Sequence, residues 1–245
     1  MVDPASTTST AYRLYRNTWL ALDWVFPPRC GGCDERGSRW CKACQEQVVR
    51  LPAEICPVCG RMMRTTGQIC RHCREVPPDY HQLRSFAIFD GSLRKALHRL
   101  KYARDIALAD NLTQPLPAFL RELGWEIDLI VPVPLSKKRL KERGYNQAAL
   151  LALPLALAAG FAYRSDALVK IKETRTQVGL NIQERRLNVS GAFCASQELV
   201  KGKRVLLFDD VTTSGATIES CAGAIMGAGA DQVFGMTLAR AAFAA

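Results

Sequence analysis

The sequence has little that would tie it to a membrane or to secretion. No uninterrupted apolar run of about 18 residues, the length that a membrane-spanning helix needs, occurs in the 245-residue chain. The N-terminal stretch YRLYRNTWLALDWVF is interrupted by Asp23, and no small-residue cleavage site follows it, so it fails as a signal peptide. These absences predict a cytoplasmic protein without a membrane span.

Long internal repeats, low-complexity tracts and the Walker pattern GxxxxGK[ST] are also missing. The composition, 48% hydrophobic and 23% charged, is ordinary for a soluble globular protein and leaves room for one sizeable domain and a small one. Within residues 1–28, Tyr15, Trp19, Leu22 and Phe26 recur at helical spacing. They predict an amphipathic helix that docks on its own protein, with a membrane-surface helix as the alternative.

Positive charge is unevenly distributed along the chain. The formal net charge is +10, and Lys and Arg exceed Asp and Glu by eight within residues 81–190. Such an excess suits a phosphorylated metabolite or nucleic acid, although a solubilising surface would look the same. Two zinc ions held by eight thiolates would lower the net charge to about +6, which is still basic.

Eight of the ten cysteines form four C-x-x-C pairs, CGGC, CKAC, CPVC and CRHC, separated by seven, eleven and ten residues. Each pair presents two sulfurs to one tetrahedral ion, so the pattern predicts two structural Cys₄ zinc sites in a double zinc ribbon over residues 29–76. The simplest grouping takes the pairs in order, and a crossed grouping stays open. The expected ligands are Cys30, Cys33, Cys41 and Cys44 for one site, and Cys56, Cys59, Cys70 and Cys73 for the other.

Disulfide bonds and iron–sulfur clusters fit the cysteine pattern less well than zinc does. A disulfide framework belongs to oxidising compartments, and the spacings differ from those of ferredoxin clusters. His72, inside the last pair, is expected to face solvent rather than to bind metal. Cys194 and Cys221 are expected to be small buried apolar residues.

After Pro77-Pro78 the chain changes to alternating strand and helix patterns, which predict a mostly parallel sheet flanked by helices. In such sheets ligands bind beyond the carboxyl ends of the strands. We expect strands at 85–89, 127–134, 167–171, 203–208 and 232–239, and helices at 91–103, 106–123, 144–160, 182–189 and 215–228, with Pro154 as a kink.

The stretch VLLFDDVTTSGAT, residues 205–217, is the strongest candidate for a binding site. Asp209 and Asp210 are expected at the carboxyl end of a buried strand. The first amides of the helix that follows can bind a phosphate, and adjacent carboxylates suit ribose hydroxyls or Mg²⁺. The pattern therefore predicts a 5′-phosphorylated ribose as ligand; a receiver-type or phosphatase-type aspartate site and a plain helix cap are weaker alternatives. The turn comprises Thr212, Thr213, Ser214, Gly215, Ala216 and Thr217.

This stretch resembles the phosphoribosyl-diphosphate (PRPP) motif of type I phosphoribosyltransferases, and the chain from Cys30 onward resembles the ComF/GntX family of DNA-uptake and DNA-utilisation proteins. The resemblance is carried by the double ribbon and by several segments in a fixed order. They are LKYARD at 100–105, VPVPLSKKRLKERGYNQAALLA at 131–152, TRTQVGLNIQERRLNVSGAF at 174–193 and the PRPP loop.

The resemblance implies a type I phosphoribosyltransferase fold over residues 80–245 and assigns roles within it. Asp209 and Asp210 would hold the ribose hydroxyls, residues 212–217 the 5′-phosphate, and Lys137, Lys138 and Arg139 the pyrophosphate together with Mg²⁺. Asp209, Asp210 and Lys137 are the catalytic candidates. Thr174–Leu180 would form a mobile hood.

Several neighbouring residues stay open at this stage. Arg143, Asn146 and Gln147 are plausible site residues, whereas Lys101 beside Tyr102 is as consistent with a surface lysine as with a residue that reaches the pocket. The run KKRLKER is either a nucleic-acid contact or a solvated helix face.

The chain also departs from related transferases. It begins Met1-Val2-Asp3, so it lacks the N-terminal nucleophilic cysteine of glutamine-dependent amidophosphoribosyltransferases, and no purine-salvage base hood is evident. The expected function is PRPP–Mg²⁺ binding and transfer of phosphoribose to an unidentified acceptor in DNA uptake or utilisation. The alternative is a non-catalytic adaptor for single-stranded DNA or a DNA-processing protein that uses the same pocket as a sensor or strand-end site.

Overall fold

Five parallel strands form the central sheet of the protein, whose computed structural model describes residues 10–25, 27–172 and 191–241. Their order across the sheet is β1-β7-β6-β2-β3, and every neighbouring pair is parallel. All five carboxyl ends therefore lie at one edge. The strands span β1 Gln82–Ile88, β2 Leu129–Pro132, β3 Ala162–Tyr163, β6 Arg204–Thr212 and β7 Gln232–Arg240.

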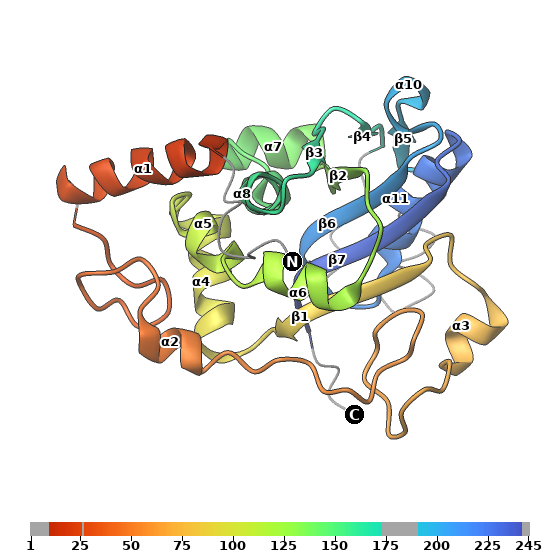
Figure 1. The fold of residues 1–245 in the computed structure, drawn as a ribbon, viewed down its shortest axis with the longest axis horizontal. Helices are drawn as coiled ribbons and strands as arrows, with labels where there is room; N and C mark the ends of the chain where they lie inside the picture. Colours follow the sequence, from red (N-terminus) through yellow and green to blue (C-terminus); the bar gives the residue numbers. More distant parts are fainter. Residues whose placement is uncertain (1–9, 26, 173–190, 242–245) are drawn as a thin grey trace, which may run out of the picture.

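Helices cover both faces of this sheet (Figure 1). One face carries α4 Gly91–Tyr102, α5 Leu108–Thr113, α6 Leu116–Leu123 and α8 Gln147–Ala159. The other face carries α11 Ala216–Gly227, beside an antiparallel hairpin of β4 Leu168–Lys170 and β5 Phe193–Ala195 and the short α10 Gln197–Val200. The basic helix α7 Lys137–Arg143 lies between β2 and α8 in the chain and buries none of its residues.

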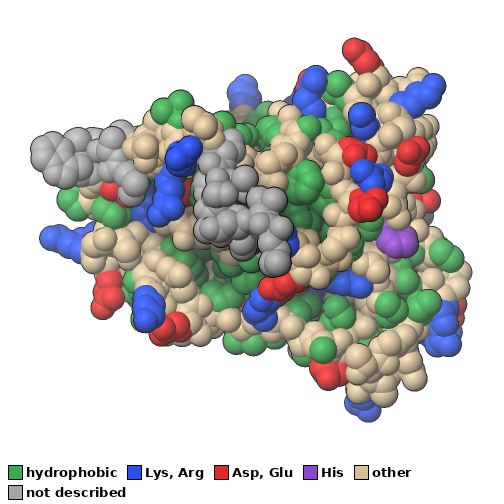
Figure 2. All heavy atoms as spheres, viewed as in Figure 1, with side chains coloured by type: hydrophobic (Ala, Val, Ile, Leu, Met, Phe, Trp, Pro, Cys, Tyr) green, Lys and Arg blue, Asp and Glu red, His purple; other side chains and the backbone are tan. Residues whose placement is uncertain are grey.

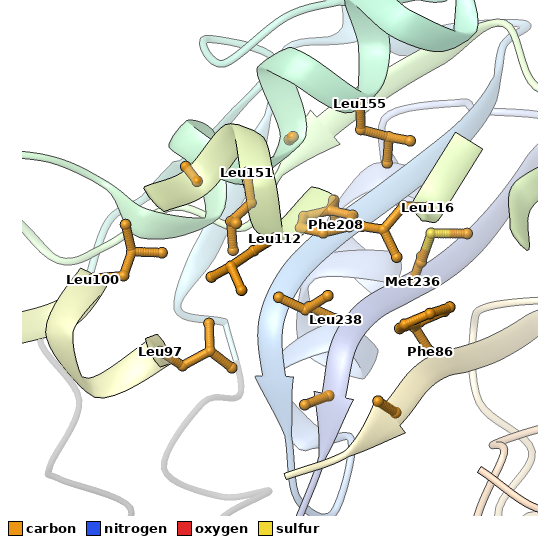
Figure 3. Close-up of a cluster of buried hydrophobic side chains, with 14 of the residues drawn as sticks. Phe86, Leu97, Leu100, Leu112, Leu116, Leu151, Leu155, Phe208, Met236 and Leu238 are labelled. Carbon is orange, nitrogen blue, oxygen red and sulfur yellow. The ribbon is translucent and has the colours of Figure 1, made fainter. Parts of the chain in front are cut away.

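Successive side chains of a strand point to opposite faces of the sheet, so the sheet contributes to two separate hydrophobic cores. In β6, Leu206 and Phe208 belong to the cluster under α4 and α8, whereas Val205 and Leu207 belong to the cluster under α11. Figure 3 shows the first cluster, where leucines of α4, α5 and α8 point toward Phe208, Met236 and Leu238 of the strands. β6 is thus buried on both faces, as its unbroken apolar run requires.

The cysteine-rich segment packs into these two cores rather than standing apart. Cys30 and Cys44, together with Trp40, belong to the cluster under α4 and α8, while the four cysteines between Cys56 and Cys73 belong to the cluster under α11. Two short helices mark the segment, α2 Lys42–Glu46 and α3 Arg71–Glu75. Each ribbon therefore contributes to a different face of the sheet.

The same segment also covers the outer edge of β1 (Figure 1). The Ile88 N–H donates to the Val49 carbonyl at 2.8 Å, and the Leu83 N–H donates to the Val58 carbonyl at 2.8 Å. Arg50 and Ala87 form an isolated antiparallel bridge between these points. Part of the exposed edge of the sheet is thereby paired with the ribbons.

The N-terminal helix α1 Thr10–Val25 contacts α8, and Tyr12 is buried with 8% exposure. The ring of Trp19 lies edge-on to Tyr15 at 6.4 Å between centroids. These contacts support the prediction that the helix docks on its own protein. Among the described residues, no helix has both the length and the apolar character that a bilayer crossing requires.

Most element predictions agree with the structure, with two informative errors. A single helix at 106–123 is wrong, because the chain breaks between α5 and α6 at Gln114 and Pro115. The predicted strand 203–208 is too short: β6 continues to Thr212, so Asp209 and Asp210 lie within the strand rather than after it. The predicted helix at 182–189 lies outside the described residues.

Charged side chains of both signs are interspersed over the face drawn in Figure 2. The positive excess of the sequence therefore does not form a single patch in this view. A concentrated positive segment is α7, where five of seven residues are Lys or Arg.

Candidate functional site

The topology of the sheet marks one position where a ligand can enter. From β2 the chain proceeds to β3 on one side, and from β6 it proceeds to β7 on the other, although β2 and β6 are neighbours. Their connections therefore diverge at the carboxyl ends of β2 and β6, and ligands of open α/β sheets bind at such a point. Asp209 and Asp210 lie at this point.

Asp210 is the centre of the polar contacts at this point. It is buried, with 3% exposure, and its carboxylate forms an ion pair with the Lys101 ammonium of α4. The Gln147 amide of α8 donates to the other carboxylate oxygen at 3.3 Å. Lys101, which the sequence left undecided, is thus a member of the polar cluster around Asp210.

The amino end of α8 is held against this acid pair. The Asn146 side chain accepts from the Ala148 N–H at 3.0 Å and donates to the Val133 carbonyl at 2.9 Å, which ties the helix start to the end of β2. Gln147, the first residue of α8, in turn receives a hydrogen bond from Arg143. The first residue of α8 is thereby held in contact with the Asp210 carboxylate.

The pKa values of the two aspartates are shifted in opposite directions. Burial raises the pKa of Asp209 well above its ordinary value, and the neighbouring Asp210 charge raises it further. Burial also acts to raise the pKa of Asp210, but Lys101 outweighs it, and the net pKa lies below the ordinary value. The Asp209 carboxylate accepts a hydrogen bond from the Asp210 N–H at 2.8 Å. The pair thus offers one firm acceptor and one group that readily binds a proton.

The turn after β6 has the geometry needed to present backbone amides. Gly215 precedes α11 at φ 90° and ψ −4°, a left-handed conformation that disfavours a side chain. The Ala216 N–H is 3.4 Å from the Ser214 hydroxyl, and Thr212 is buried with 5% exposure. The aligned peptide dipoles of α11, which has twelve residues, place partial positive charge at its first amide groups.

The remaining predicted ligand-binding residues lie at the rim. Lys137, Lys138 and Arg139 are exposed at the start of α7, which follows β2 and is capped by Ser136. Within the described part of the chain, Lys101 rather than Lys137 forms the ion pair with Asp210. The predicted hood, Thr174–Leu180, lies outside the described residues.

The cysteines gather into two groups of four in chain order. The sulfurs of Cys30, Cys33, Cys41 and Cys44 lie within 4.8 Å of one another, and so do those of Cys56, Cys59, Cys70 and Cys73. This is the sequential grouping rather than the crossed one. All ten cysteines lie in the described ranges, and none forms a disulfide.

The spacing within each group suits a tetrahedral zinc ion. Zn–S bonds of about 2.3 Å place the sulfurs about 3.8 Å apart. The sulfurs of Cys33 and Cys41 are separated by 3.6 Å, and those of Cys59 and Cys70 by 3.8 Å. Four thiolates per ion leave no coordination position for water, so the sites suit a structural role.

Comparison with known proteins agrees with these features. Residues 21–74 match the model of the double zinc ribbon domain. The DNA utilization protein YhgH of Salmonella typhimurium is 33% identical over 203 residues, 80% of this chain and 88% of that protein. The chain belongs to the ComF/GntX family.

Two competence proteins of the same family are also similar. Competence protein F of Haemophilus influenzae is 29% identical over 208 residues, 82% of this chain and 90% of that protein. Competence protein ComFC of Bacillus subtilis is 28% identical over 231 residues, 91% of this chain and 89% of that protein. Membership in this family of DNA-utilisation and competence proteins confirms the resemblance seen in the sequence.

Two solved enzyme structures show a distant similarity to the chain. An adenine phosphoribosyltransferase from Thermoanaerobacter pseudethanolicus is 14% identical with a TM-score of 0.35, over 81% of this chain and 98% of that one. An allosteric regulatory enzyme of purine biosynthesis is 26% identical with a TM-score of 0.36, over 53% of this chain and 25% of that one. The mostly parallel sheet flanked by helices and the double zinc ribbon of the predicted fold class are confirmed.

The structure also shows how exposed Cys194, Cys221 and His72 are. Cys221 is fully buried in α11, as expected, but Cys194 is exposed on β5, so the prediction that it is buried was wrong. The short hairpin leaves one side of β5 uncovered. His72 is half-buried on α3 and lies outside the group of four sulfurs.

The cysteine groups predict about two zinc ions per purified chain, because each group provides one Cys₄ site. Cys73→Ser should lower the content to about one and reduce thermal stability, since the ribbon forms part of the core under α11. Cys194→Ser is the matched control, because Cys194 is exposed and belongs to neither group, and it should keep both ions. Folded protein without zinc by elemental analysis would contradict the prediction.

Asp209→Asn should stabilise the protein at neutral pH. A carboxyl whose folded pKa is raised contributes stability below its unfolded pKa of about 4, and that contribution is lost as pH rises through the folded value. The variant avoids the loss, so its unfolding midpoint at pH 7 should lie above that of the wild type, and the gain should vanish near pH 4. Asp90→Asn, at an exposed aspartate after β1, should show no such pH-dependent gain; an unchanged Asp209→Asn midpoint would refute the argument.

Proposed function

We propose that the chain binds PRPP with Mg²⁺ at the carboxyl ends of β2 and β6 and transfers phosphoribose to an acceptor with release of pyrophosphate, in DNA uptake or utilisation. The observation that carries the proposal is the acid pair of the half-buried Asp209 and the buried Asp210, which lies before the left-handed glycine at the start of α11, where the connections of the parallel strands β2 and β6 diverge. A phosphorylated sugar matches both features, since it combines neighbouring hydroxyls with an anion.

In this proposal Asp209 and Asp210 bind the ribose 2′- and 3′-hydroxyls. Asp210, with its lowered pKa, serves as an ionised acceptor, and Asp209, with its raised pKa, can share a proton with the second hydroxyl. Lys101 neutralises Asp210 when no sugar is bound. Sugar binding therefore has to compete with, or rearrange, this ammonium group.

The phosphate and pyrophosphate occupy opposite sides of the sugar. The turn Thr212–Thr217 receives the 5′-phosphate through the first amides of α11 and its hydroxyl groups. Lys137, Lys138 and Arg139 on the β2 side receive the pyrophosphate, and Lys137 stabilises the charge of the leaving group. Bound Mg²⁺ would supply further charge neutralisation on the pyrophosphate.

A second candidate function is single-strand binding. The helix α7 is basic over its whole length and buries none of its residues, and the neighbouring Tyr102 is 73% exposed with the Arg143 guanidinium 5.3 Å from its ring centre. An exposed aromatic ring beside a basic helix can stack a base and contact phosphates. Tyr145 is less suited to stacking, because it is partly buried and its hydroxyl donates to the Leu100 carbonyl.

Asp210→Asn tests the sugar site. Loss of the charged acceptor should weaken PRPP–Mg²⁺ binding by about 10- to 100-fold in calorimetric titration, the range expected when a hydrogen bond to a charged group is lost. Asp90→Asn, at the same edge of the sheet but exposed, should bind as the wild type does. Equal affinity in the Asp210→Asn variant would remove the assigned role. Release of pyrophosphate with nucleobase, ammonia or oligonucleotide acceptors tests turnover.

The strand-binding candidate is tested with a double variant, Tyr102→Ala with Lys141→Ala, which leaves the proposed PRPP residues intact. Affinity for a labelled single strand should fall, and the salt dependence should flatten by about 0.7 in the log–log slope for each lost phosphate contact. PRPP affinity should stay unchanged. Strand binding that is insensitive to salt would rule out this function.

A further inference from the structure

Arg240, the last residue of β7, lies between the second zinc ribbon and the turn after β6. It is 3% exposed, and its guanidinium donates to the Cys59 carbonyl at 2.5 Å and to the Thr213 carbonyl at 3.2 Å. Among the described residues, its Nε has no hydrogen-bond partner and no carboxylate forms an ion pair with it. A buried guanidinium is costly without such compensation, so these two carbonyls carry its interactions.

The contact to Thr213 sets the direction of a backbone amide. The Thr213 carbonyl and the Ser214 N–H belong to one planar peptide unit, which is trans, and they point in opposite directions. Holding the carbonyl toward Arg240 therefore aims the Ser214 N–H away from β7. The preceding unit is fixed in the same way, since the Thr212 carbonyl accepts from the Ala241 N–H at 2.9 Å. Two successive amides of the turn are thus oriented by the end of β7.

The contact to Cys59 brings in the metal site. Cys59 is one of the four cysteines of the second group, and a zinc ion with four thiolates carries a net charge of about −2. With zinc bound, this charge would compensate for the buried Arg240 cation. The loop that carries Cys59 also packs closely against β1. Gly60, the next residue, has φ 66°, and a side chain there would come within 2.4 Å of the Leu83 carbonyl oxygen. Cys59, held by a bound zinc ion, would therefore fix the position of Arg240, and the negative charge of the site would favour its cation.

A second contact joins the same region to the turn. Tyr80 is 6% exposed and belongs to the cluster that contains the second cysteine group. Its hydroxyl, with a methyl of Leu83, lies next to the Gly215 backbone that starts α11. The turn after β6 is therefore supported by residues packed on the second ribbon as well as by Arg240.

We propose that Arg240 is a positioning residue that makes the anion-binding turn Thr212–Thr217 depend on metal occupancy of the Cys56, Cys59, Cys70 and Cys73 site. Zinc in the second ribbon holds Arg240, Arg240 holds the Thr213 carbonyl, and the peptide unit then presents the Ser214 N–H. The inference rests on the proposed function of the turn as the 5′-phosphate site. It assigns the second ribbon a role in ligand affinity in addition to folding.

Arg240→Met tests the link, with Arg84→Met as the matched control. Arg84 donates to the carbonyls of Pro57 at 2.8 Å and Val58 at 3.5 Å. It therefore binds the same cysteine loop as Arg240 does, but among the described residues it has no hydrogen bond to the turn Thr212–Thr217. In calorimetric titration of ribose 5-phosphate and of PRPP–Mg²⁺, Arg240→Met should bind about tenfold more weakly while it keeps two zinc ions. Arg84→Met should bind within about twofold of the wild type. Wild-type affinity in Arg240→Met would overturn the proposal.

The dependence on zinc is tested by a double-variant cycle. Cys70→Ser removes the second site and should weaken binding in the wild type but have little further effect in Arg240→Met, because the link is already broken. Cys41→Ser, in the first group, should have the same effect in both backgrounds. If the losses of affinity caused by Cys70→Ser and by Arg240→Met multiply in the double variant, the two residues act independently and the coupling is refuted.

Two further measurements cover the cases in which Arg240→Met does not fold or the wild type binds neither ligand. If Arg240→Met fails to fold or loses zinc, Arg240→Lys, which keeps the charge and one hydrogen bond, replaces it and should show reduced affinity and shifted amide NMR signals at Thr213–Thr217. Wild-type signals and wild-type affinity in that variant would overturn the inference. If the wild type itself binds neither ligand, the proposed function fails, and the amide signals of the ligand-free variants alone decide whether Arg240 orients the turn.

Discussion

The site depends on one constraint of the sheet, the parallel direction of β6 and both of its neighbours. Because β2, β6 and β7 run the same way, their carboxyl ends deliver three kinds of group to one place: the start of α7, the acid pair and the Arg240 guanidinium. A reversed strand would send one of these groups to the opposite edge. The connections diverge between β2 and β6, which is the point where ligands bind in open α/β sheets, and Asp210 lies there.

The two ribbons act as supports for this arrangement. The Ser92 hydroxyl donates to the Cys44 carbonyl at 2.9 Å, and the Arg99 guanidinium lies 3.4 Å from the Cys30 carbonyl, so the first ribbon is bound to α4. The same helix carries Lys101 to the acid pair. The second ribbon reaches the turn through Arg240. Each metal site is therefore tied, through a backbone carbonyl of a cysteine, to a different element of the candidate site.

Much of the fold could be predicted from the sequence because its signals are local. The four cysteine pairs, the alternating strand and helix patterns and the glycine before α11 each depend on residues close together in the chain. The length of β6 could not be predicted in this way: Asp209 and Asp210 are poor strand formers, and only pairing with β7, from Asp209 with Thr237 to Thr212 with Arg240, keeps them extended. Tertiary pairing overrode local preference there.

The contacts made by single cations were also beyond sequence reasoning. Lys101 lies far along the chain from Asp210, and Arg240 is 27 residues from Thr213, and nothing in their own neighbourhoods distinguishes them from surface residues. An arginine at the end of the apolar run VFGMTLAR is the one hint, since a buried strand rarely ends in a buried charge. The partners became evident only when α4, β6 and β7 were placed side by side.

The pairing of the cysteine-rich segment with β1 has a consequence for solubility. An uncovered edge strand offers a row of backbone donors and acceptors that another molecule can extend into a continuous sheet. Here residues 49 and 58 occupy positions along that row, and no second copy of the chain can add a strand there while they stay in place. The ribbons thus protect part of the β1 edge against pairing with another strand, and a chain shortened to begin at β1 would expose that edge.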